Sequence, residues 1–275
     1  MRCATIILPP VLKAVVLLVV LILSLLFSAG CSRTRVTEDF FQSYRVRSGT
    51  VLEIYNPNGQ VTVTGSDHDE VEIAALKETY HGQSALDEVD IFIDIGEIMI
   101  IETVHSADGK DVTVSYDIKV PEGVEVSVVE CSNGNIDLQG ISGSPVLSTS
   151  NGNISVSAVG GVVSARSSNG DLDIKSVEGL GYLRTSNGDI IADLPDIRED
   201  LDIRTSNGSI SLSINPELAF YLEASTSNGE ISFSNLDLEI SIQEQTLLSG
   251  IMNGGGPKLN ITTSNGSIDL AQLQQ

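Results

Sequence analysis

The sequence predicts an all-β protein: a single-stranded β-solenoid (β-helix) with coils of about 18–21 residues and an irregular N-terminal β section. The first observation is a turn motif, Ser-Asn-Gly, that occurs seven times. Its asparagines follow one another at intervals of 18, 18, 18, 20, 21 and 37 residues, and the last interval is about two periods. The turn residues are Asn133, Gly134, Asn151, Gly152, Asn169, Gly170, Asn187, Gly188, Asn207, Gly208, Asn228, Gly229, Asn265 and Gly266.

The second observation is an apolar alternation around each turn. Three positions after each asparagine there is an aliphatic residue, another apolar residue follows two positions later, and mostly Asp or Ser stands between them. This period of two is typical of a strand with one buried face. The first of these columns contains Ile136, Ile154, Leu172, Ile190, Ile210, Ile231 and Ile268.

The third observation is that equivalent positions keep the same residue type. The side chain two positions before each asparagine is always small: Cys131 in the first copy and Thr or Ser in the others. An antiparallel meander is the alternative architecture, because Asn-Gly between alternating strands is a strong hairpin signal. A solenoid is favoured, because its equivalent positions stack directly at ~4.8 Å and therefore need matching residues. Since Asn and Gly tolerate positive φ, we expect it at Gly152, Gly170, Gly188 and Gly208.

Residues 1–30 have the pattern of a lipoprotein-type signal peptide. An apolar run from Ala14 to Ala29 leads to Ser28-Ala29-Gly30-Cys31, which resembles a lipobox with Ser28 where Leu is usual. Cys31 is then the expected lipidation site. The alternative is an uncleaved anchor helix, although Pro9, Pro10 and Lys13 shorten the apolar span. Both interpretations predict a protein held at a membrane, on the extracytoplasmic face of the cell envelope.

The rest of the chain is strongly acidic. Without Arg2 and Lys13, residues 31–275 carry 13 basic and 37 acidic side chains, a formal charge of −24. This charge argues against nucleic acid as a partner. The motifs of calcium loops and of nucleotide-binding sites are missing from the sequence, so we expect no metal and no cofactor.

Catalytic residues are not expected either. The three histidines, His68, His81 and His105, do not have metal-ligand spacing, and Cys131 reads as a buried packing residue. The outward pair Asp171 and Asp173 keeps a polysaccharide-acting enzyme open as an alternative.

The organisation along the chain follows from these patterns. After the signal we expect a linker at 31–44 and one β domain at 45–275. Residues 45–120 form its irregular N-terminal part, and 121–275 form the Ser-Asn-Gly repeats. Within the repeats, Arg166, Arg184 and Arg204 fall in one column, and we expect them to lie beside Asp171 and Asp189 in an exposed ion-pair network.

These segments resemble a known family. A degenerate Asn-Pro-Asn-Gly turn at 56–59, the Val-Pro-Glu-Gly-Val segment at 120–124, the Ser-Asn-Gly series and a late Gly-rich loop are similar to the β-strand-repeat adhesins (domain of unknown function 4097) of bacterial and archaeal envelopes. The resemblance covers about 45–273 and implies a β-solenoid, with no catalytic residues to carry over.

We therefore expect an adhesin-like binding or structural protein, with a cell-wall polymer or an envelope protein as its partner. An accessory protein of an envelope-stress signalling system is a further alternative.

Overall fold

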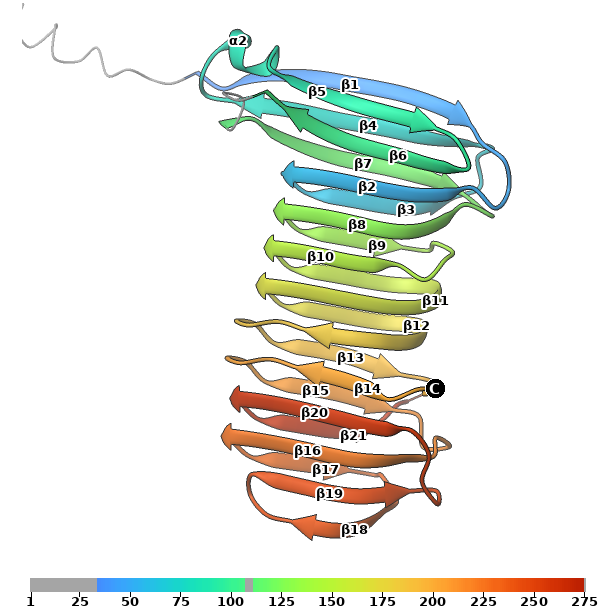
Figure 1. The fold of residues 1–275 in the computed structure, drawn as a ribbon, viewed down its shortest axis with the longest axis vertical. Helices are drawn as coiled ribbons and strands as arrows, with labels where there is room; N and C mark the ends of the chain where they lie inside the picture. Colours follow the sequence, from blue (N-terminus) through green and yellow to red (C-terminus); the bar gives the residue numbers. More distant parts are fainter. Residues whose placement is uncertain (1–33, 107–110, 275) are drawn as a thin grey trace, which may run out of the picture. The chain divides into compact units, whose positions relative to one another are not determined.

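The structure is a computed structural model that describes residues 34–106 and 111–274. Val36–Gln275 forms one compact unit. Within it the chain winds into a flattened solenoid with two facing sheets (Figure 1). Each coil contributes one strand before its Asn-Gly turn and one strand after it. We call the two layers the pre-turn sheet and the post-turn sheet.

The pre-turn sheet runs the whole length of the unit. In spatial order its strands are β5 (Val89–Ile95), β6 (Ile98–His105), β2 (Val51–Asn58), β8 (Glu125–Asn133), β10 (Val146–Asn151), the second half of β11 (Ile154–Asn169), the second half of β12 (Leu172–Arg184), β14 (Leu201–Arg204), β20 (Lys258–Asn265), β16 (Phe220–Asn228), β19 (Leu247–Met252) and β18 (Leu238–Gln243).

The post-turn sheet lies behind it. Its strands are β1 (Val36–Arg45), β4 (Glu70–Thr79), β7 (Thr113–Pro121), β3 (Val61–Ser66), β9 (Ile136–Gln139), the first halves of β11 and β12, β13 (Ile190–Leu194), β15 (Ile210–Ile214), β21 (Ile268–Gln272) and β17 (Ile231–Ser234). β11 and β12 bend around the edge opposite the turns, with a break in register after Val159, and so belong to both sheets.

Successive coils pair in parallel, and their equivalent residues are aligned. Asn151 is opposite Asn133 on one side and Asn169 on the other. A meander would pair its neighbouring strands antiparallel, so the expected solenoid is confirmed. The parity of the strands is also confirmed, because Ile190 and Ile210 are fully buried while Ser211 and Asp173 on the outer face are partly exposed.

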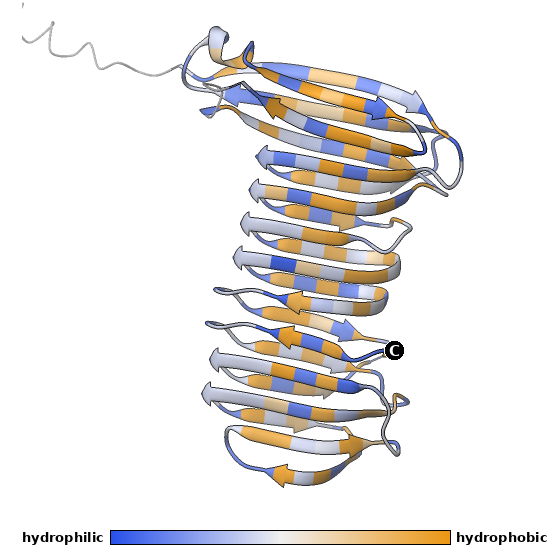
Figure 2. Ribbon diagram, viewed as in Figure 1, coloured by the Kyte–Doolittle hydropathy of each residue, from blue (hydrophilic) through white to orange (hydrophobic). Residues whose placement is uncertain are grey.

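The core is a single apolar cluster between the two sheets. Figure 2 shows the corresponding alternation of orange and blue or white bands along the strands. Each fully buried aliphatic side chain contributes about 1.5–3 kcal/mol relative to an exposed one. Because every coil adds such residues at the same positions, the cluster continues from coil to coil.

The N-terminal part closes one end of this core. β4 pairs antiparallel with β1 and β7, β5 pairs antiparallel with β6, and the short helix α2 (Gln83–Leu86) buries Leu86. The expected linker at 31–44 is wrong from Val36 onward, because β1 occupies this stretch. Its Val36, Phe40 and Tyr44 pack against the core, whereas the Thr, Glu and Asp residues between them made the segment look like a polar linker.

The C-terminal coils do not stack in chain order. β20 lies between β14 and β16, and β21 lies between β15 and β17. The last coil of the sequence is therefore inserted next to the coil of Asn207, and the coil of Asn228 is displaced outward. Beyond it, β18 and β19 form an antiparallel hairpin that extends the pre-turn sheet.

Candidate binding surface

The Asn-Gly turns form one continuous edge of the solenoid. The exposed asparagine side chains are joined in a ladder in which each Nδ2 donates to the Oδ1 of the neighbouring asparagine, at 2.7–2.9 Å. In spatial order the ladder contains Asn58, Asn133, Asn151, Asn169, Asn187, Asn207, Asn265 and Asn228. An amide has two donor hydrogens and two acceptor lone pairs, so each interior asparagine keeps one lone pair and, except at Asn169, one donor hydrogen for a partner outside the ladder. The second donor hydrogen of Asn169 is directed at the Ser150 carbonyl, at 3.4 Å.

The glycines lie directly behind this ladder. The hydroxyl two positions before each asparagine donates to a glycine carbonyl of the preceding coil in the stack, as Thr149 does to Gly134 (3.0 Å) and Thr185 to Gly170 (2.9 Å). Cys131 occupies the same position in its coil, and its Sγ donates to the Gly59 carbonyl at 3.2 Å. These bonds explain why the buried column two positions before each asparagine contains small donors.

The expected positive φ is found at Gly170, Gly188 and Gly208, with values of 158°, 157° and 155° at the border of extended backbone, but not at Gly152. None of the ladder asparagines has positive φ. The reason that all four glycines share is close approach: a Cβ on Gly152 or Gly170 would collide with the carbonyl oxygen of the stacked glycine in the preceding coil. The motif is therefore a stacking motif of parallel coils, not a hairpin turn.

A serine precedes every asparagine of the seven motif copies, and it lies on the same edge. The column contains Ser132, Ser150, Ser168, Ser186, Ser206, Ser227 and Ser264, of which all except the half-buried Ser168 are exposed. Among the described residues none of their hydroxyls makes a hydrogen bond within the protein. The signal for this column is present in the sequence, since the residue is identical in all seven copies. We call these serines and the ladder asparagines the Ser-Asn edge.

The cysteine and the acids beside the turns have structural roles. Burial raises the pKa of Cys131 to about 11, so its thiol is protonated and unreactive at neutral pH. Asp171 accepts the backbone N–H of Asp189 at 2.8 Å, and Asp173 forms an ion pair with Lys175 at 2.9 Å. Both carboxylates of the possible hydrolytic pair are therefore engaged in contacts within the fold.

The arginine column lies on the outer face of the pre-turn sheet, as the spacing predicts, but its acidic partner is a different residue. Arg184 Nη2 is 2.8 Å from Asp202 Oδ2, and Arg204 Nε is 2.5 Å from Asp202 Oδ1. Asp171 and Asp189 lie at the turns, where their carboxylates accept backbone N–H groups. The expected pairing with them is wrong, because Asp202 is two residues from Arg204 and shares its face of the strand. Arg184 also lies over the ring of Tyr182, at 5.6 Å.

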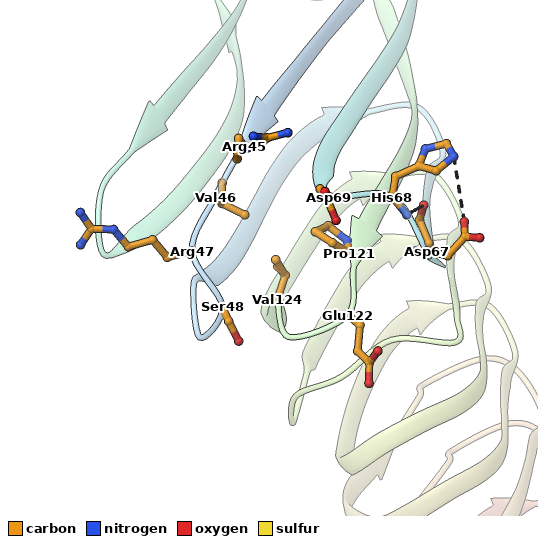
Figure 3. Close-up of a pocket in the computed structure, with 11 residues that line it drawn as sticks. Arg45, Val46, Arg47, Ser48, Asp67, His68, Asp69, Pro121, Glu122 and Val124 are labelled. Carbon is orange, nitrogen blue, oxygen red and sulfur yellow. Dashed lines mark hydrogen bonds and ion pairs between the residues drawn. The ribbon is translucent and has the colours of Figure 1, made fainter.

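A cleft of about 540 Å³ lies in the N-terminal part, where the β1–β2, β3–β4 and β7–β8 connections meet (Figure 3). His68 Nδ1 lies 2.8 Å from Glu72 Oε1, and this hydrogen bond, together with the charges of His68 and Lys119, lowers the pKa of Glu72. The Ser66 hydroxyl accepts the backbone N–H of His68 and makes no hydrogen bond to the imidazole. The cleft thus contains an imidazole and carboxylates, but its serine is not arranged as a nucleophile activated by a base.

The structure says nothing about the predicted anchor, since residues 1–30 and Cys31 lie outside the described residues. Within 34–106 and 111–274 there is no helix long and apolar enough to cross a membrane. In the same ranges no group of three or more His, Cys, Asp or Glu side chains is arranged to hold a metal ion.

Two facing sheets of parallel-stacked coils, closed by antiparallel ends, define a β-solenoid with a repeated polar edge. The chain belongs to the Toastrack DUF4097 family, whose model matches residues 45–271. None of the curated proteins matches the chain.

Several solved structures are similar over most of their length. A candidate cell adhesion protein from Clostridium sporogenes is 10% identical, with a TM-score of 0.32, over 86% of this chain and 100% of the other. A candidate adhesin from Bacteroides fragilis is 10% identical, with a TM-score of 0.38, over 86% and 97%. One from Parabacteroides distasonis is 7% identical, with a TM-score of 0.28, over 85% and 97%. At these scores the likeness carries no argument about function.

Proposed function

We propose that this protein is a non-catalytic, adhesin-like binding protein of the cell envelope, held at the membrane by lipid on Cys31. The Ser-Asn edge is its binding surface, and its partner is an extended, uncharged polar polymer such as a cell-wall polysaccharide. The observation that carries the proposal is the ladder, which presents amide and hydroxyl groups at the regular ~4.8 Å spacing of stacked strands.

The chemistry of the edge fits such a polymer. Each of the seven Ser-Asn-Gly copies offers an amide and a serine hydroxyl without a net charge, so it can both donate to and accept from hydroxyl groups. The formal charge of −24 on residues 31–275 opposes polyanions. The ladder also holds the amides in place, so little side-chain entropy is lost when a long partner binds.

The edge can be tested with matched serine variants. Full-length protein in detergent is mixed with an insoluble cell-wall polysaccharide preparation and sedimented. We expect wild type to sediment with the polymer and the triple variant Ser150→Ala, Ser168→Ala, Ser186→Ala to remain in solution. The control carries Ser155→Ala, Ser211→Ala and Ser213→Ala on the outer face of the post-turn sheet, and it should sediment like wild type. Equal sedimentation of the two variants, or no sedimentation of wild type, contradicts the proposal.

The anchor is tested separately. In cells fed a radiolabelled fatty acid, wild type should incorporate the label, and Cys31→Ala should remain an unlabelled precursor of lower mobility. Equal labelling and mobility of the two proteins would show that Cys31 carries no lipid. This result would leave the role of the Ser-Asn edge intact.

A further inference from the structure

Each asparagine of the ladder, which we call a rung, is followed by a glycine. Asn-Gly is the dipeptide in which asparagine deamidates most readily. Glycine has no side chain to shield its backbone nitrogen, which can attack the amide carbon Cγ of the preceding asparagine. In a folded protein the attack requires that this nitrogen and this amide be released from their hydrogen bonds. The hydrogen bonds of each rung therefore decide how fast its asparagine is lost.

The interior rungs are held twice. The glycine N–H donates to the asparagine carbonyl of the next coil, as Gly134 does to Asn151 and Gly188 to Asn207, both at 2.9 Å. The side-chain Oδ1 accepts the Nδ2 of the next asparagine, as Asn187 does from Asn207 at 2.8 Å. Both bonds join the rung to the coil that follows it in the stack, on the side away from the N-terminal part. Every rung from Asn58 to Asn265 receives both of them.

The rung of Asn228 is different because no further Asn-Gly coil follows it in the stack. Its Nδ2 donates to Asn265 at 2.9 Å, and its backbone carbonyl accepts from Gly266 at 3.0 Å. Among the described residues, however, nothing donates to its Oδ1, and the Gly229 N–H donates to no acceptor. The β18–β19 hairpin bonds only around this turn, through Thr226 N–H to Thr246 and Ile231 N–H to Gln245.

We propose that Asn228 is the deamidation site of the ladder, and that stacking protects its seven other asparagines. The Gly229 nitrogen forms a bond to Cγ of Asn228 and loses its proton, while the bond from Cγ to Nδ2 breaks and ammonia leaves. Water then opens the resulting succinimide at either carbonyl. The product has aspartate, or isoaspartate linked through its side chain, in place of Asn228.

The position limits the damage to the fold. A carboxylate at 228 faces the Oδ1 of Asn265, so two acceptors meet and one rung is lost. Aspartate at 187 would likewise lose only the bond to Asn169, because its carboxylate still accepts from Asn207, but isoaspartate there would add a backbone atom between two stacked coils. The new charge also adds to the acidic surface beside Glu230. The reaction therefore changes the outermost rung of the binding edge while the rest of the stack keeps its bonds.

The test is peptide mapping by mass spectrometry of the full-length protein after prolonged incubation at mildly alkaline pH. Replacement of NH₂ by OH is followed separately at each ladder asparagine. One missing hydrogen bond corresponds to roughly a factor of five and Asn228 lacks two, so it should convert about 25-fold faster than the other seven. An interior asparagine that converts as fast as Asn228 would overturn the proposal. Asn253, which also precedes a glycine, lies in a loop outside the ladder and is not part of this comparison.

Two controls separate stacking from local sequence. In concentrated urea the eight rates should become similar, and a persistent lead of Asn228 would assign its lability to the sequence around it. Asn207→Ala removes the amide that donates to Asn187 and keeps the backbone bond from Gly188. Conversion of Asn187 should then rise about fivefold, since one of its two bonds is gone. An unchanged rate at Asn187 would contradict protection by the ladder.

Discussion

At the scale of single residues, the turn glycines are required by close approach between coils. A Cβ on Gly152 would collide with the Gly134 carbonyl, and the stacked backbones cannot separate without breaking the ladder. Gly152→Ala should therefore lower the free energy of unfolding by about 3 kcal/mol, the upper end of the usual cost of overpacking. The measurement is urea denaturation of both proteins.

Gly160→Ala is the matched control for this prediction. Its new Cβ would have no neighbour closer than 3.9 Å, and its φ is not positive. We expect a change within about 0.5 kcal/mol. Neither glycine has positive φ, so equal losses for the two variants would mean that close approach is not what requires glycine at the turn.

Cys131 provides a second prediction at this scale. Its buried thiol has a pKa raised from 9.0 to about 11, so the folded state favours the protonated form. The resulting stability is fully present below pH 9 and is lost as the pH rises through about 11. Alkylation of Cys131, followed by peptide mass spectrometry, should be slow in native protein at neutral pH and fast in urea. Equal rates in the two conditions would show an accessible thiolate.

At the scale of the strand, neighbouring positions face opposite sides of the sheet, and substitutions there differ in their cost to stability. On β13 Ile190 is fully buried, whereas Ile191 is 44% exposed. Ile190→Ala should cost about 2–5 kcal/mol, because it removes apolar area and leaves a cavity between the sheets. Ile191→Ala should cost no more than about 0.5 kcal/mol. Thermal unfolding of the two variants checks this prediction, and similar shifts would mean that the parity of β13 is misassigned.

The outer face of the pre-turn sheet allows a test of its charges. Arg184→Ala removes an exposed bond to Asp202 and should cost ~0–1 kcal/mol, with a loss that shrinks as salt screens the pair. Arg166→Ala is the control, since Arg166 makes no ion pair within 4.0 Å among the described residues. It should be neutral at every salt concentration. A salt-independent loss at Arg184 would instead indicate packing of its side chain on Tyr182.

Strand parity, the small column and the stacked turns could be predicted, because each depends on a residue type repeated at one position. The partner of Arg184 could not, because the position of Asp202 is not a column of one residue type and carries Ser164, Tyr182, Glu223 or Asn260 in other coils. The strand at Val36–Arg45 was also missed. Edge strands carry polar residues that oppose aggregation, and these weaken the alternation by which a strand is recognised. The positions of the serines in the Ser-Asn edge could be predicted from the sequence. Their exposure to solvent could not, because it depends on how the coils stack.

At the scale of the whole molecule, the sequence predicts a stack but not the order of its coils. Since every coil presents the same ladder residues to its neighbours, the coil of Asn265 pairs with those of Asn207 and Asn228 by the same contacts as any other coil. Chain order is therefore only one of several ways to satisfy the repeats. The distinct segments, β1 with β4 to β7 and the β18–β19 hairpin, mark the ends of the stack.

If stacking between equivalent coils is the main source of stability, the molecule should tolerate the loss of one complete interior coil. Deletion of residues 154–171 removes 18 residues, one full period, and joins Asn153 to Leu172. Leu172 then takes the buried place of Ile154 against Ile136, and Asn187 stacks on Asn151. Because repeat stability is roughly a sum over neighbouring units, the variant should fold cooperatively with a moderately lower melting temperature.

Deletion of residues 155–171 removes one residue fewer and joins Ile154 directly to Leu172. Two inward residues then follow each other, and every later side chain of that strand turns to the wrong face. We expect this variant to be insoluble or to unfold without a cooperative transition. Circular dichroism during heating shows whether each of the two deletion variants unfolds cooperatively. If both fold equally well, the register of the coils is not what holds the stack together, and the non-repeating ends must specify the fold instead.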